Sequence, residues 1–93
     1  MAATSADRVL GLLAAASGDT EAATRHFEGG LRFCRDAGYR AEWAWTAHDY
    51  IAFRARNDGQ SEATALLDEA REVAGELGMV ALLEQLERQH SIG

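Results

Sequence analysis

Apolar residues recur at spacings of three and four along most of the chain, and short polar segments containing glycine interrupt them. This spacing is typical of amphipathic α-helices, and the glycine-containing segments mark where one helix ends and the next begins. Such segments occur at Ser17–Thr20, Asp36–Gly38, Asn57–Gly59 and Gly78. The pattern predicts an all-α fold of five helices in a single domain, residues 1–93. The expected helices cover about 5–17, 21–37, 40–56, 62–77 and 79–90.

The expected helix 40–56 differs from the others because it is apolar on several sides. It contains both tryptophans, Trp43 and Trp45, together with Tyr50 and Phe53. A small-residue stripe runs along the same helix: Ala44, Ala47, Ile51, Ala52 and Ala55. A helix that is apolar on several sides is covered by neighbours on several sides. We therefore expect helix 40–56 to be the central helix.

Each remaining helix has an apolar stripe that we expect to be buried. In helix 5–17 the stripe is Val9, Leu10, Leu13 and Ala14. In helix 21–37 it is Ala23, Phe27, Gly30, Leu31 and Cys34. In helix 62–77 it is Ala63, Leu66, Leu67, Ala70, Val73, Ala74 and Leu77. In helix 79–90 it is Met79, Leu82, Leu83 and Leu86. The connections are very short, so consecutive helices must lie antiparallel.

The chain contains an internal repeat. Ala23-Thr24 recurs 40 residues later as Ala63-Thr64, and at the same offset Phe27 matches Leu67 and Gly38 matches Gly78. Upstream, the segment Leu10-Gly11-x-x-Ala14 matches Ile51-Ala52-x-x-Ala55 at an offset of 41. Two related helix pairs are thus followed by the first helix of a third.

These copies resemble the tetratricopeptide repeat (TPR), whose pattern is W-x2-L-G-x2-Y, then A-x3-F, then P. The matching positions are Leu10, Gly11, Ala23 and Phe27 in the first copy, and Ile51, Ala52, Ala63 and Leu67 in the second. The resemblance implies a right-handed solenoid of about two and a half repeats. Small residues at Gly11 and Ala52 would let paired helices approach closely.

The chain also departs from the TPR pattern. Asp7 and His48 replace the tryptophan, Ala14 and Ala55 replace the tyrosine, and the chain has no proline. The repeat exceeds the usual length of about 34 residues. In this respect it resembles the carboxy-terminal arrays of large bacterial signalling ATPases and LuxR-type transcriptional regulators.

Charge and composition limit the possible partners. The net charge is −6, lysine is absent, and the arginines are dispersed among acidic residues. This argues against nucleic-acid binding, which needs clustered basic side chains. The longest apolar run, Val9–Ala16, is too short to span a bilayer. A single cysteine, Cys34, cannot form an internal disulfide, so we expect a cytoplasmic protein.

Nothing in the sequence predicts catalysis, a metal site or a cofactor. His48-Asp49 is the pair that most resembles a catalytic one, but neighbouring helical residues point about 100° apart. We therefore expect His48 to pack between helices and Asp49 to face solvent or a groove. Cys34 lies on an apolar stripe and is expected to be a buried, inert thiol.

The TPR resemblance implies an interaction groove along the first helix of each pair. Its predicted residues are Arg8, Leu12, Ala15, Asp49, Phe53 and Arg56. Mixed charges around two apolar side chains suit a peptide segment or a partner helix. Two and a half repeats leave the first helix without a preceding pair, so we also expect self-association or a longer array.

Three functions therefore compete. The first is a protein-protein interaction scaffold within a bacterial signalling or transcriptional regulator. The second is a small-molecule sensor with an aromatic pocket lined by Trp43, Trp45, Tyr50 and Phe53. An enzyme ranks last, because no catalytic pair has a suitable spacing.

Overall fold

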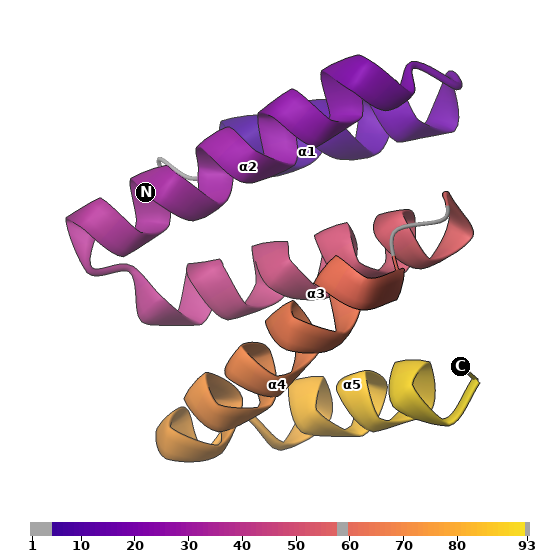
Figure 1. Ribbon diagram of the computed structural model, residues 1–93. Coiled ribbons are helices and arrows are strands. Elements are labelled where there is room, and N and C mark those ends of the chain that lie inside the picture. Colours follow the sequence, from indigo (N-terminus) through magenta and orange to yellow (C-terminus); the bar gives the residue numbers. More distant parts are fainter. Residues whose placement is uncertain (1–4, 58–59, 93) are drawn as a thin grey trace.

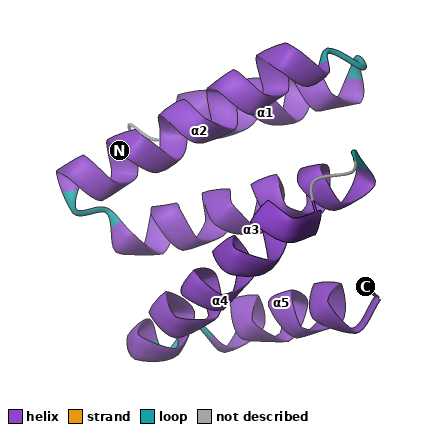
Figure 2. Ribbon diagram, in the orientation of Figure 1, coloured by secondary structure: helices purple, strands orange, loops and turns teal. Residues whose placement is uncertain are grey.

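The computed structural model describes residues 5–57 and 60–92, and five helices form its secondary structure (Figures 1 and 2). They are α1 (Ser5–Ala16), α2 (Thr20–Ala37), α3 (Arg40–Arg56), α4 (Gln60–Leu77) and α5 (Val80–Ile92). These bounds agree with the expected ranges to within one turn. The predicted turn residues Asp58 and Gly59 lie outside the described part. No described helix is both long and apolar enough to cross a bilayer.

The turns after α2 and α4 have the same backbone geometry. Gly38 and Gly78 adopt left-handed φ angles of 79° and 70°, which only glycine tolerates at little cost. In each turn the amide after the glycine donates to the carbonyl four residues before the glycine, at 2.9 Å. This closure is the Schellman type of helix stop. The two positions that match in the sequence repeat therefore perform the same structural role.

Helix α3 is the centre of the molecule. It packs against α1, α2, α4 and α5, and in Figure 1 it lies between the α1–α2 pair and the α4–α5 pair. Its buried residues are Trp43, Ala44, Thr46, Ala47, Tyr50, Ile51 and Phe53. The predicted central position is confirmed. Ala55, at the end of the expected small-residue stripe, is instead exposed.

Two apolar clusters form the core. One joins α2, α3, α4 and α5, and its members include Cys34, Ala47, Leu67 and Leu82. The other is aromatic and consists of Ala23, Phe27, Tyr50 and Phe53, which come from α2 and α3. The predicted stripes of α2, α4 and α5 supply these clusters, except that Leu77 is exposed at the end of α4.

Helix α1 is rotated relative to the prediction. Val9, Leu10 and Leu13 were expected to be buried, but all three are exposed. Within 7–16, the part of α1 whose burial is described, the buried residue is Gly11, which rests on the ring of Phe27. The apolar run Val9–Ala16 has two apolar sides, so periodicity alone could not choose between them. The absence of a side chain at Gly11 decides the choice, because it lets α1 approach α2 closely.

Gly11 provides a direct test of this approach, with Gly75 as a matched control. A Cβ atom added at Gly11 would lie 3.0 Å from the Phe27 ring, whereas one added at Gly75 meets no atom within 4 Å. We expect Gly75→Ala to stabilise the protein by about 0.5–1 kcal/mol through helix propensity. Gly11→Ala is expected to destabilise it, because overpacking typically costs about 1–3 kcal/mol. Urea unfolding of both variants measures the difference, and equal stabilisation would show that α1 does not approach α2 as described.

Candidate functional site

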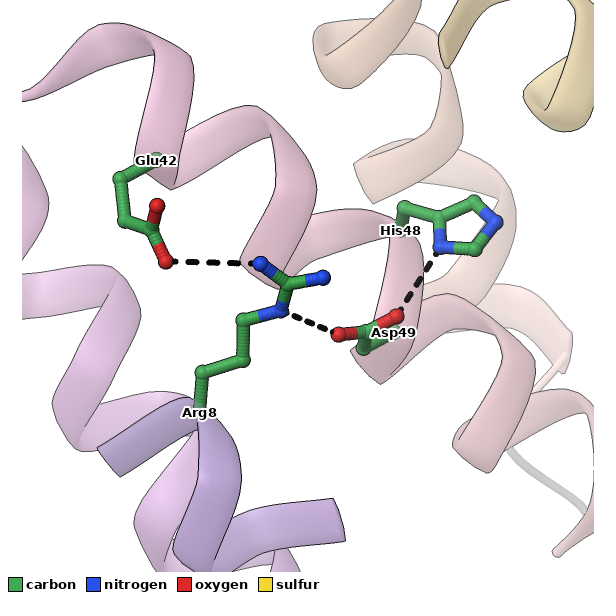
Figure 3. Close-up of polar contacts among 4 residues, drawn as sticks. All are labelled: Arg8, Glu42, His48 and Asp49. Atoms are coloured by element: carbon green, nitrogen blue, oxygen red, sulfur yellow. Dashed lines mark hydrogen bonds and ion pairs between the residues drawn. The ribbon is translucent and has the colours of Figure 1, made fainter. Parts of the chain in front are cut away.

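Arg8 of α1 connects the first helix pair to α3 (Figure 3). Its Nε donates to Asp49 Oδ2 at 2.5 Å, and its Nη1 lies 3.6 Å from Glu42 Oε2. The guanidinium therefore lies between two carboxylates that are two helical turns apart on α3. All three side chains are partly buried, so water screens these charges less than it would at the surface.

His48 and Trp45 complete this polar cluster. His48 Nδ1 lies 3.0 Å from Asp49 Oδ1, and its ring packs edge-on against Trp45. The Arg8 guanidinium lies 5.7 Å from the Trp45 ring centroid, a cation–π distance. One expectation is therefore wrong. The neighbouring His48 and Asp49 side chains do meet, because rotation about their side-chain bonds overcomes the angle between them. Asp49 also faces Arg8 of α1.

The environment of Asp49 favours its charged form. Partial burial alone would raise the pKa of its carboxyl, but hydrogen bonds and charge from His48 and Arg8 outweigh burial. The net result is an Asp49 pKa below its ordinary value. Asp49 is consequently a carboxylate near neutral pH, held between a guanidinium and an imidazole. This arrangement joins α1 to α3.

The internal repeat of the sequence could have predicted the contact between Arg8 and Asp49. Arg8 and Asp49 are separated by 41 residues, which is the offset that relates Leu10-Gly11 to Ile51-Ala52. They therefore occupy equivalent positions in successive first helices. When such helices pack side by side, opposite charges at equivalent positions can pair. The predicted groove contained both residues but did not pair them.

The other predicted groove residues do not form one surface. Phe53 is 2% exposed and belongs to the aromatic cluster, so its assignment to an open groove is wrong. Ala15 packs partly against the same cluster. Leu12 and Arg56 are exposed. Of the six residues, the structure brings Arg8 and Asp49 into direct contact.

The four residues of the predicted aromatic pocket also lie in different parts of the structure. Tyr50 and Phe53 lie in the aromatic cluster, whereas Trp43 belongs to the other cluster and Trp45 packs against its edge. Trp43 lines an open hollow of about 310 Å³ between α2, α3 and α4. The remaining lining residues are Cys34, Arg35, Gly38, Arg40, Glu69 and Val73. Carboxylates of α4 already pair with both arginines, Glu69 with Arg35 and Glu76 with Arg40.

Helix α1 has an exposed apolar surface. Val9, Leu12, Leu13 and Ala16 are all exposed and follow the spacing i, i+3, i+4, i+7, so they form one stripe on the helix. We call these four residues the α1 stripe. Val9 is 49%, Leu12 43% and Leu13 61% exposed. The chain has no charged residue between Arg8 and Asp19, so the stripe is uninterrupted along α1.

The described side chains include no group of three residues that could hold a metal ion. Cys34 is fully buried, as predicted for a small apolar side chain. Comparisons with protein-family models, curated proteins and solved structures found no match to this chain.

Proposed function

We propose that this chain is a TPR-like interaction module that binds a protein partner through the α1 stripe. The single observation that carries the proposal is the exposure of Val9, Leu12 and Leu13 on one side of one helix. Contiguous apolar patches on a protein surface are characteristic of interaction sites. A helix partner or an apolar segment of another protein has the chemistry to cover this stripe.

The helix arrangement supports the TPR-like part of the proposal. The first helices of the proposed pairs, α1, α3 and α5, contact one another in succession. Gly11 and Phe27, which match the small and large positions of the TPR pattern, lie against each other. A right-handed solenoid accounts for both observations. The likeness to the arrays of bacterial regulators further suggests that the partner belongs to a signalling or transcriptional assembly.

The test is site-specific photo-crosslinking in cells, followed by a binding measurement. A photoreactive phenylalanine analogue at position 13 is expected to give a discrete protein adduct, identified by mass spectrometry. The matched control is position 80, because Val80 is similarly exposed (64%) but lies on α5. The identified protein is then purified and titrated, and Leu13→Glu is expected to weaken its binding at least ~10-fold, since the glutamate must be buried on binding.

Two results would overturn the proposal. One is the absence of any adduct at position 13 above the background seen at position 80. The other is a purified partner that binds the wild type and the Leu13→Glu variant equally well. Circular dichroism of the variant distinguishes lost binding from lost folding.

A further inference from the structure

We infer that the partner of the α1 stripe is a second copy of this chain, bound across a two-fold axis with α1 against α1. This inference rests on the proposed function, which assigns binding to α1, and names the partner. The inference rests on the internal repeat, on the side chains that α1 and α5 expose, and on the absence of charged residues from the α1 stripe.

The repeat shows how such a stripe is covered within the molecule. The offset of 41 places Val9 at the position of Tyr50 and Leu12 at the position of Phe53. Tyr50 and Phe53 are buried against Phe27 of the preceding pair. The centroid of the Phe27 ring lies 5.5 Å from that of Tyr50 and 5.7 Å from that of Phe53. Val9 and Leu12 of the α1 stripe therefore correspond to interface positions of α3, and no described helix pair lies over them. Leu13 and Ala16, which complete the stripe, correspond to Arg54 and Asn57.

Among the described residues, α5 has charged side chains at two positions where α3 has buried apolar ones. At the offset of 40 that relates Gly38 to Gly78, the fully buried Ala44 and Ala47 of α3 become Glu84 and Glu87 of α5. Both glutamates are exposed. Stacking of copies head to tail would bury these charges against the α1 stripe, which is costly.

A two-fold arrangement avoids this cost. It places the same surface on both sides of the interface, so the apolar stripe of one copy meets the apolar stripe of the other. No charged side chain follows Arg8 until Asp19, so the stripe carries no charge to repel its copy. Antiparallel α1 helices also align their dipoles favourably. The assembly closes at two copies, whereas a head-to-tail stack continues into a filament.

Analytical ultracentrifugation of the purified full chain over about 1–200 µM tests the inference, in the range typical of weak protein association. The wild type is expected to sediment as a monomer–dimer equilibrium that does not grow beyond the dimer. Leu13→Glu is expected to raise the dimer dissociation constant at least ~100-fold, because it places like charges on both sides of one interface. Val80→Glu, at an equally exposed apolar position on α5, is expected to leave the constant within about twofold, because surface positions outside the interface contribute little.

Three outcomes would overturn the inference. They are a monomeric wild type, a dimer unaffected by Leu13→Glu, and association that Val80→Glu also abolishes, which indicates head-to-tail stacking. A monomer whose position 13 still crosslinks to another protein refutes self-association but leaves the proposed function standing. A monomer without such an adduct refutes both.

Discussion

Phe27→Ala is expected to cause the largest loss of stability of any single substitution considered in this protein. Phe27 is fully buried and stacks on Tyr50 while packing against Phe53. Its ring also supports Gly11 of α1, so one side chain connects α1, α2 and α3. Truncation of a buried phenylalanine costs about 3–5 kcal/mol. That loss is a large part of the roughly 5–15 kcal/mol that stabilises a typical domain.

Thermal and urea unfolding followed by circular dichroism measure the effect. For a domain of this length the loss corresponds to a melting temperature lower by about 15 °C or more. The control is Phe33→Ala on the same helix. Phe33 is 43% exposed, so its removal is expected to cost about 1–2 kcal/mol. Equal losses for the two variants would show that the aromatic cluster does not hold the helix pairs together.

The sequence predicted the helices and the central position of α3 because local features encode both. Glycine supplies the left-handed stops at Gly38 and Gly78, and these act within a few residues of the chain. The many-sided apolar character of α3 required neighbours on several sides, whatever those neighbours were. The buried stripe of α2 was equally clear, because its opposite side is strongly polar.

The rotation of α1 and the contacts of the polar cluster depend on packing between helices. The periodicity of a single helix does not encode that packing. Val9 and Leu13 have the spacing of a buried stripe, yet the close approach of Gly11 to Phe27 turns them outward. Phe53 was placed in a groove by its position in the repeat pattern, but the aromatic ring of Phe27 covers it. Such errors arise where two apolar sides compete and tertiary packing selects one.

The interface between the α1–α2 pair and α3 combines a polar contact with an apolar one. Arg8 and Asp49 join α1 and α3 through charge, while Phe27, Tyr50 and Phe53 join the pairs through apolar packing. Apolar packing is non-directional, whereas a guanidinium–carboxylate hydrogen bond has a defined geometry. The polar pair is therefore suited to fix the register of α1 on α3, while the aromatic cluster buries apolar side chains between α2 and α3.

Asp49→Asn is expected to have the second largest effect on stability. The substitution keeps the shape of the side chain but removes the charge that faces Arg8 Nε and His48 Nδ1. Hydrogen bonds to charged groups contribute about 1.5–3 kcal/mol, so we expect a loss of about 2 kcal/mol at pH 7. Asp68→Asn is the control, because its carboxylate is 74% exposed and such surface pairs contribute less than about 1 kcal/mol.

The pH dependence of this loss separates charge from shape. The folded protein lowers the Asp49 pKa, so the unfolded chain, with an aspartate pKa of about 3.9, binds the proton more tightly. The stability from Asp49 is therefore complete above about pH 5 and declines as the pH falls through about 4 towards the lower folded pKa. Urea unfolding is expected to show a constant difference between wild type and Asp49→Asn from pH 7 to 5, and a shrinking difference below about pH 4. A difference that stayed constant down to pH 3 would mean that the ionised carboxylate does not stabilise the α1–α3 contact.

In an Arg8→Met background the Asp49→Asn substitution is expected to cost much less, because the guanidinium that the carboxylate pairs with is gone.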